Sequence, residues 1–282
     1  MLKRILLAVQ FHTVLPVKVN GPVQEEDMAG SIPFFPLAGA AQGFFLAVSA
    51  MAFAHFFDFD RYAAGALALA VYIILSGGFD LDGLADTADA LSVKSSGDPE
   101  ADRQKRLEIM KDSHVGAMGV IALIISILLK FVLISGLLAL TEPYAFALLF
   151  MMPVFSKWAT VPVMFHGKPA RKEGLGRLFI GNAGAKDVAL ASLLLLCLWF
   201  AVFSSLFIYR QEGMLRQVHL FPFLFLFFPL IIFLYAEGRA AARFLSRKFG
   251  GLTGDHLGAI TEASEILFLI AASLWPHLAA HI

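Results

Sequence analysis

Residues 77–91 read GGFDLDGLADTADAL and follow a segment that is apolar enough to dissolve in lipid. The stretch places four aspartates within ten positions, at the mouth of an expected membrane helix. The rest of the chain is also apolar, because 59% of its 282 residues are hydrophobic and the mean hydropathy is +0.75. A soluble domain of this length has no interior large enough to hide that share. We therefore expect an all-α integral membrane protein whose aspartates mark a site.

A helix that crosses a bilayer needs about 20 mostly apolar residues. Seven segments meet this requirement, which predicts one membrane domain over residues 1–282, built as a polytopic bundle of about seven transmembrane helices. The expected spans are 33–57, 62–79, 115–140, 144–165, 188–209, 218–236 and 257–276. The N-terminal MLKRILLAVQFHTVLPV has a short apolar core and no small-residue cleavage site after it. We expect it to form a retained amphipathic helix at the membrane surface.

Charge is distributed unevenly between the connecting segments, although the formal net charge is zero. Segments on one side hold 17 Lys and Arg residues, and those on the other side hold only Arg61, Arg210 and Arg216. By the positive-inside rule, this predicts a cytoplasmic N-terminus in the cytoplasmic (inner) membrane, with the polar motifs on the cytoplasmic face. Zero net charge argues against nucleic acid as a partner. A single cysteine, Cys197, excludes a disulfide framework and a thiolate metal site.

The aspartates of the opening segment form a stripe if the chain is helical from about residue 82. At 100° per residue, Asp82, Asp86 and Asp89 fall within about 60° of one another. Their repulsion needs an opposing charge, and hard oxygen donors at short range suit Mg²⁺, with Mn²⁺ as the alternative ion. We expect Asp80 to join this metal site only if its turn is not helical. The competing interpretation is a group of solvated surface charges.

A second acidic stripe lies in GGLTGDHLGAITEASEILFLI, residues 250–270. Asp255 and Glu262 share one helix face, so both are candidate metal ligands. Glu262 and Glu265 lie in the first turns of an apolar span, where an ionisable group is usually functional or paired. Pairing with an intramembrane lysine is therefore the alternative for the glutamates. For Lys130, however, we expect the ammonium to snorkel to the interface.

Two basic loops complete the polar motifs: RLEIMKDSHVGAMG (106–119) and HGKPARKEGLGRLFIGNAG (166–184). Glycine-rich backbone beside Arg and Lys is typical of a phosphate cradle. The positive-inside rule alone would also demand basic loops here. The expected phosphate-binding residues are Arg171, Lys172, Arg177, Lys157, Arg106 and Lys111. Metal-binding acids beside phosphate-binding cations indicate metal-assisted phosphoryl or nucleotidyl transfer.

These motifs resemble, in order and spacing, those of the cobalamin synthase family, also called adenosylcobinamide-GDP ribazoletransferase. The similarity extends over nearly the whole chain, and DGLADTADAL is its most specific part. The matching stretches are PFFPLAG (33–39), GGFDLDGLADTADAL (77–91), RLEIMKDSHVGAMG (106–119), ARKEGLG (170–176) and GGLTGDHLGAITE (250–262).

The resemblance implies a magnesium-dependent membrane enzyme of the last step of adenosylcobalamin assembly. Its substrates would be adenosylcobinamide-GDP and α-ribazole or α-ribazole 5′-phosphate, with GMP released. A carboxylate that metal does not saturate could accept the hydroxyl proton. We expect this base to be Asp89, then Asp112, and count Asp86 with them as catalytic. A homo-oligomer, or a complex with other corrinoid-assembly enzymes, stays open.

Two positions depart from the family pattern, since Asp80 stands where His is expected and His114 where Arg is common. Neither removes the central aspartates. Three rival functions remain at this point: a CDP-alcohol phosphotransferase-like enzyme, a prenyltransferase and an ion-coupled transporter. The first lacks half of its signature here and the second lacks a second DxxxD motif. A transporter would place its acids near the middle of the bilayer, whereas these gather at one face.

Overall fold

The computed structural model describes residues 1–140, 142–211 and 220–279, and helices make up most of them. Within these ranges the predicted all-α class is confirmed, and the isolated bridge between Pro169 and Leu252 is the β-type pairing present. The first half contains α1 (Leu2–His12), α2 (Glu25–Ala29), η1 (Ile32–Phe34), α3 (Phe35–Met51), η2 (Ala52–Phe56), α4 (Arg61–Ser76), α5 (Phe79–Leu91), α6 (Pro99–Ile109) and α7 (Ala117–Leu137). The second half contains α8 (Glu142–His166), η3 (Leu175–Leu178), α9 (Ala185–Gln211), α10 (Leu220–Phe249) and α11 (Gly254–Ala279).

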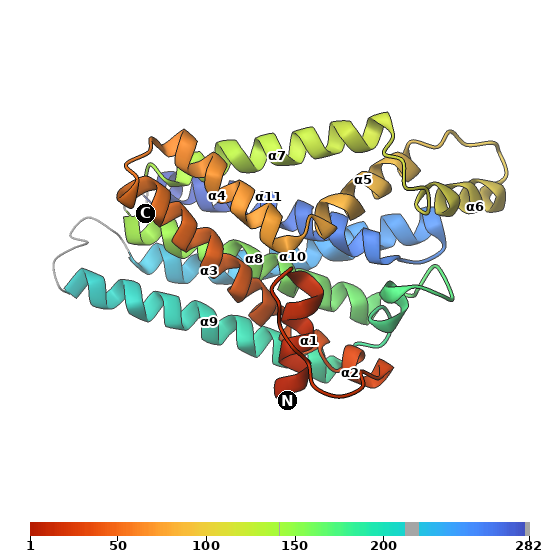
Figure 1. Cartoon of the computed structure of the whole chain (residues 1–282), viewed down its shortest axis with the longest axis horizontal. Coiled ribbons are helices and arrows are strands. Elements are labelled where there is room, and N and C mark those ends of the chain that lie inside the picture. Colours follow the sequence, from red (N-terminus) through yellow and green to blue (C-terminus); the bar gives the residue numbers. More distant parts are fainter. Residues whose placement is uncertain (141, 212–219, 280–282) are drawn as a thin grey trace.

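Long apolar helices run along one common axis (Figure 1). Five helical segments of the described ranges are long and apolar enough to cross a membrane: Glu25–Phe56, Ala117–Leu137, Pro143–His166, Ala185–Ile208 and Gly254–Leu274. Counting the bent α4–α5 pair as one span gives 6, so the expected count of seven is not confirmed. The expected span 62–79 is shorter than predicted, since α4 ends at Ser76. The expected span 218–236 begins at 218–219, outside the described residues.

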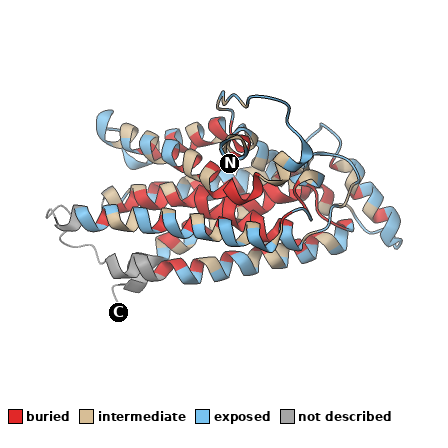
Figure 2. Cartoon of the chain, turned by 90° about the horizontal axis from the view of Figure 1, so that it is seen from below, coloured by how far each residue is buried: buried red, intermediate tan, exposed pale blue. Residues whose placement is uncertain are grey.

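The centre of the bundle is α8, whose apolar stretch is almost entirely buried. Figure 2 shows buried residues concentrated along the middle of the bundle. Two glycines let α3 approach α8 closely. A Cβ on Gly39 would lie 2.3 Å from the backbone oxygen of Pro153, and one on Gly43 would lie 2.0 Å from that of Phe150. Small residues at such crossings permit the backbone packing that holds membrane helices together.

A sharp turn between α4 and α5 bends the chain by 86°. Gly77 ends α4 and Gly78 begins α5, and both have left-handed φ values, of 67° and 69°. A side chain at either position would strain this backbone, which explains the paired glycines. The turn directs α5, with its aspartates, away from the apolar axis of α4 and toward α11. We therefore treat α5 as lying beyond the apolar layer.

The predicted N-terminal helix is confirmed as α1, whereas its position at a lipid surface stays a prediction. It runs across the axis of the bundle in Figure 1. Its C-terminal half is anchored by burial, because Leu7, Ala8 and His12 are all buried. This docking places His12 next to the polar end of α8.

Candidate active site

Asp80 lies in the first turn of α5, where its side chain pairs with a lysine of the central helix. The Lys157 Nζ donates to Oδ2 of Asp80 at 2.5 Å. Because Lys157 is only 1% exposed, this carboxylate supplies the partner that a buried ammonium requires. The chain is already helical at Asp80, so this residue points away from Asp82. Lys157, an expected phosphate ligand, is thus paired with an acid of the protein.

Asp82 and Asp86 lie on α5 where it crosses the first turn of α11, which carries Asp255. The crossing is close, because a Cβ on Gly83 would lie 2.6 Å from the backbone oxygen of Asp255. Burial and then the neighbouring carboxylates, Asp82 and Asp255 foremost, raise the pKa of Asp86 to about 6. Three acids from two helices therefore share one electrostatic environment, and this environment holds an excess of negative charge.

These three carboxylates suit a hard divalent cation by their chemistry. Oxygen donors are the ligands that Mg²⁺ prefers, and a cation would relieve their mutual repulsion. Asp82 is exposed, and Asp86 and Asp255 are half-buried, so their side chains have room to turn. In the described part of the chain, no three His, Cys, Asp or Glu side chains converge as closely as a bound metal requires. A metal ion would therefore have to draw these side chains together.

Asp89, the expected general base and metal ligand, caps another helix. Its Oδ2 accepts a hydrogen bond from the backbone N–H of Gly116 at 2.7 Å, and its Oδ1 accepts one from Gly119 at 2.8 Å. These donors belong to the N-terminus of α7, where backbone N–H groups lack helical partners and attract negative charge. The side chain is buried. Both oxygens of its carboxylate therefore serve as hydrogen-bond acceptors that link α5 to α7.

Arg171 links the carboxylates to a basic concavity in the loop after α8. It is the principal cation acting on Asp86 and Asp255. One Nη of Arg171 donates to the Leu107 backbone oxygen at 2.9 Å, which fixes the guanidinium. A concavity of about 360 Å³ opens beside it and is also lined by Lys111, Lys172 and Glu173. Three of the expected phosphate-binding residues thus meet beside Asp82, Asp86 and Asp255, which we call the acidic cluster.

The other expected basic and catalytic residues of the loops have partners elsewhere. Arg177 forms an exposed ion pair with Glu25 at 2.8 Å. Arg106 is buried, lies 4.0 Å from Asp102, and donates to the Lys248 backbone oxygen at 3.3 Å. Asp112, the second candidate base, is exposed and accepts a hydrogen bond from His114 Nδ1 at 2.6 Å, which holds its pKa below the usual range. The structure therefore does not bring these three residues into the acidic cluster.

Glu262, an expected metal ligand, belongs to a buried ion network in the bundle core. Its Oε1 accepts from Lys130 Nζ at 2.7 Å, and its Oε2 accepts from Ser126 at 2.5 Å. Lys130 also pairs with Glu265, which accepts a hydrogen bond from Tyr72. Lys130 is 1% exposed, so the expected snorkelling is wrong and pairing between the span residues is confirmed. Both oxygens of Glu262 are engaged here, and we leave it out of the metal site.

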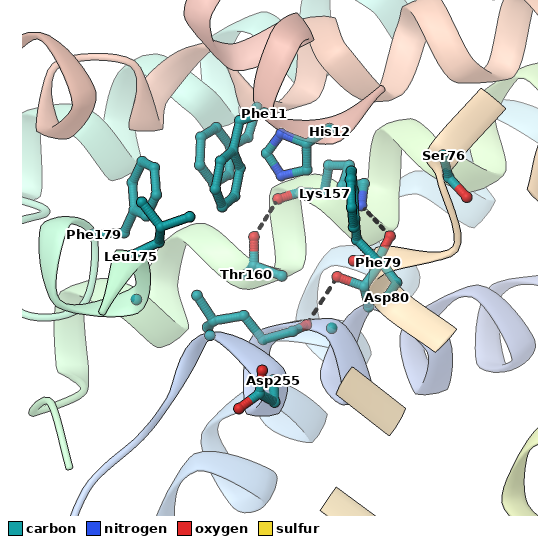
Figure 3. A pocket seen from close by; sticks show the side chains of 16 residues that line it. Phe11, His12, Ser76, Phe79, Asp80, Lys157, Thr160, Leu175, Phe179 and Asp255 are labelled. Atoms are coloured by element: carbon teal, nitrogen blue, oxygen red, sulfur yellow. Dashed lines mark hydrogen bonds and ion pairs between the residues drawn. The ribbon is translucent and has the colours of Figure 1, made fainter. Parts of the chain in front are cut away.

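A cavity of about 270 Å³ lies between α1, α8, α5 and the start of α11 (Figure 3). Phe11 and Phe179 stand on one side of it, and the Lys157–Asp80 pair stands on the other. Phe35 and Phe79 add further aromatic surface. Asp255 lies at the lower edge of the cavity in this view. The cavity therefore adjoins the acidic cluster, with Asp255 common to both.

Most polar groups of the cavity wall are already satisfied by the protein. Thr160, Thr261 and Ser76 each donate a hydroxyl hydrogen bond to a backbone oxygen of their own helix. His12 Nδ1 donates to the Ala8 oxygen at 2.9 Å. Burial, with a contribution from Lys157, lowers the pKa of His12 to about 3, so the imidazole is neutral near pH 7. This wall fits a flat apolar ring better than a purine, whose several polar atoms would find few partners.

Sequence reasoning missed this cavity, because its wall combines residues far apart in the chain. His12 was part of an expected surface helix, and Phe179 was one of 28 phenylalanines. A lone histidine in an apolar helix would have been the only local signal, and such a residue is often buried for structural reasons.

Comparison with known proteins places these features in a family. Residues 4–273 match the family described as cobalamin-5-phosphate synthase. The adenosylcobinamide-GDP ribazoletransferase of Thermodesulfovibrio yellowstonii is 36% identical over 272 residues, which is 96% of this chain and 95% of the relative. The proteins of the same name from Geotalea daltonii and Desulfitobacterium hafniense are 33% and 34% identical, each over 96% of both chains. No solved structure matches the chain.

Proposed function

The chain belongs to the cobalamin-5-phosphate synthase family, and we propose from this membership that it is an adenosylcobinamide-GDP ribazoletransferase. It would join adenosylcobinamide-GDP to α-ribazole or its 5′-phosphate and release GMP. Membership favours this reaction over the CDP-alcohol phosphotransferase, prenyltransferase and transporter alternatives. The assignment of the active site rests on one observation, which is that the acidic cluster lies between Arg171 and the aromatic cavity.

Each part of the site suits one part of the two substrates. The aromatic cavity would hold the ring of the ribazole, with its ribose toward Asp255. Arg171 would bind the diphosphate of the second substrate, with Lys111 and Lys172 of the same concavity. Asp82, Asp86 and Asp255 would hold Mg²⁺, with Mn²⁺ as a substitute. A bound ion would neutralise phosphate charge and stabilise the departing GMP oxygen.

In the reaction, a ribose hydroxyl oxygen attacks the phosphorus that carries the cobinamide. A new O–P bond forms, the bond to the GMP oxygen breaks, and the hydroxyl loses its proton. Asp80 and Asp255 are the carboxylates that line the cavity, and Asp80 is held by Lys157. We therefore assign the proton acceptor to the Asp255 oxygen that the metal would leave free, in preference to Asp89, whose oxygens cap α7.

The test is GMP release from adenosylcobinamide-GDP by the purified protein in lipid vesicles, with α-ribazole or its 5′-phosphate as acceptor. Product should form only when acceptor and Mg²⁺ are both present, and a chelator should stop it. No GMP from a folded preparation with either acceptor would refute the function.

A pair of variants tests the metal assignment separately. Asp82→Asn should lower turnover by roughly 100-fold or more, because a ligand of the transition-state charge is lost. Glu108→Gln, an exposed change at the same end of the bundle, should leave turnover unchanged. Near-normal turnover in Asp82→Asn would remove Asp82 from the metal site.

A further inference from the structure

A basic groove lies outside the candidate active site, between the end of α8 and the last turns of α10. Its volume is about 320 Å³, and its wall carries Lys168, Arg239, Arg243 and Arg247. It shares no lining residue with the concavity beside Arg171. Four cations in one small groove repel one another unless an anion joins them.

The protein itself provides no such anion. No acidic residue lines the groove among the described residues, and none of the four cations forms an ion pair in that part of the chain. Lys168, Arg243 and Arg247 are exposed and Arg239 is half-buried, so the charges of the groove face the surroundings of the protein. The groove is therefore a site of uncompensated positive charge.

The floor of the groove is held in place by backbone pairing. Leu252 N–H donates to the Lys168 oxygen, and Ala170 N–H donates to the Leu252 oxygen, both at 2.8 Å. A Cβ on Gly251 would lie 2.7 Å from the Lys168 oxygen, so glycine is needed for this close approach. The loop after α8 is thereby fixed against the end of α10. The groove is thus formed before any ligand binds.

The cations continue a stripe of exposed apolar residues on α10. Phe228 is 63% exposed and Ile232 is 69% exposed, as expected for side chains that face lipid. On a helical wheel, Arg239, Arg243 and Arg247 all fall within about 60° of Ile232. The three arginines lie about 10 to 22 Å beyond Ile232 along the helix axis. One face of α10 thus changes from apolar to cationic over a length that matches the step from the acyl chains to the head groups of a lipid layer.

Tyr235 marks the change between the two halves of this face. It lies between Ile232 and Arg239, and its hydroxyl is 2.8 Å from His166 Nε2. Tyrosine is typical of the level at which lipid tails meet head groups. A soluble phosphate would use the cations but would gain nothing from the apolar stripe.

We infer that this groove binds the phosphate head group of an anionic phospholipid, whose acyl chains lie along Phe228 and Ile232. The site anchors one side of the bundle at the membrane surface, apart from the reacting groups. It is independent of the transferase reaction, so the binding test below does not depend on activity.

The experiment is native mass spectrometry of the delipidated full chain with phosphatidylglycerol or phosphatidylcholine. The wild type should retain phosphatidylglycerol and not phosphatidylcholine. The triple variant Arg239→Gln/Arg243→Gln/Arg247→Gln should bind phosphatidylglycerol about tenfold or more weakly, since each surface cation adds to the attraction. The matched control Lys94→Gln/Lys105→Gln/Lys248→Gln removes the same charge from exposed sites outside the groove and should bind as the wild type does.

Separate arms with inorganic phosphate and GMP distinguish a lipid from a soluble ligand. Neither should displace phosphatidylglycerol at millimolar concentration if the acyl chains contribute as proposed. Equal loss of phosphatidylglycerol in both triple variants would overturn the assignment, because bulk charge would then explain the binding. Displacement by phosphate or GMP would also overturn it, in favour of a soluble anion. All variants replace exposed or half-exposed side chains, and their melting temperatures should match the wild type.

Discussion

Asp89 and Asp86 stand one turn apart on α5, yet they have different surroundings. Asp86 faces other acids, whereas Asp89 accepts hydrogen bonds from two N–H groups of α7. Helical periodicity predicts that Asp82 and Asp86 share a face and that Asp80 does not. It does not predict the role of Asp89, because the donors lie 27 and 30 residues further along the chain.

Replacing Asp89 should affect stability more than metal binding. Asp89→Ala leaves the buried N–H of Gly119 and the partly buried N–H of Gly116 without acceptors, which should lower the free energy of unfolding by roughly 2–4 kcal/mol. Thermal unfolding in detergent measures this loss. As a control, Asp98→Ala removes an exposed cap of α6 and should cost only about 1 kcal/mol. Unchanged melting together with weaker Mg²⁺ binding would instead make Asp89 a metal ligand.

Phe79 offers a test of the aromatic cavity, because it lines the cavity and is 59% exposed. Phe79→Ala should raise KM for the ribazole substrate by about tenfold, since stacking area is lost, and leave KM for adenosylcobinamide-GDP unchanged. Steady-state kinetics with each substrate varied in turn measures both constants. Phe44→Ala, at an exposed position outside the cavity, is the control. A rise only for adenosylcobinamide-GDP would assign the cavity to the other substrate.

Two different kinds of contact hold α11 to its neighbours α5 and α7. At its start, glycine at position 83 lets α5 cross in backbone contact. Further along, Lys130 of α7 pairs with Glu262 and Glu265 of α11. The sequence indicated that these ionisable groups need partners, but it could not choose between Lys130 and Lys157, the two lysines inside the expected spans. Only the packing of α7 on α11 decides that Lys130 is the partner.

Gly83→Ala should separate α5 from α11, because its new methyl group would overlap the Asp255 backbone. We expect the free energy of unfolding to fall by about 1–3 kcal/mol, as in overpacked cores, together with a large loss of turnover. The control is Gly136→Ala in α7, where a Cβ meets nothing within 4 Å. That change should be neutral or stabilising by up to about 1 kcal/mol. Equal melting temperatures for the two variants would contradict the close crossing.

Lys130→Met should destabilise the bundle, because it leaves two buried glutamates without their cation. The expected cost is about 3–5 kcal/mol, measured by denaturant unfolding in detergent. Adding Glu262→Gln and Glu265→Gln to the same chain should recover most of the loss, since the uncompensated charges are then removed. If the single variant were as stable as the wild type, the network would not join α7 to α11.

Composition predicted the membrane class and most of the long helices, because hydropathy reports directly on contact with lipid. It overestimated the second span, since it could not show that α4 ends at Ser76 and that the chain bends by 86° at Gly77 and Gly78. The asymmetry of Lys and Arg predicts which end of the bundle faces the cytoplasm. In Figure 1 the turn before α4 and the loop after α5 lie at opposite ends of the bundle.

Cysteine labelling tests this orientation. In a Cys197→Ala background, Lys94→Cys should react with a membrane-impermeant maleimide only in inside-out vesicles. Phe57→Cys, at the opposite end, should react only in right-side-out cells or spheroplasts. The reverse pattern would invert the proposed topology. Reaction of both from one side would contradict the fold.

The burial of α8 has a consequence for how the chain enters the bilayer. This helix contacts protein on nearly every side, so it can carry Ser156, Lys157 and Thr160. An insertion machinery that tests each segment against lipid would accept α7 or α9 readily and α8 poorly. The innermost helix should therefore integrate only together with the segments made before it and those made after it. Biogenesis would then be a cooperative event, and a truncated nascent chain ending after α8 should fail to retain it in the membrane.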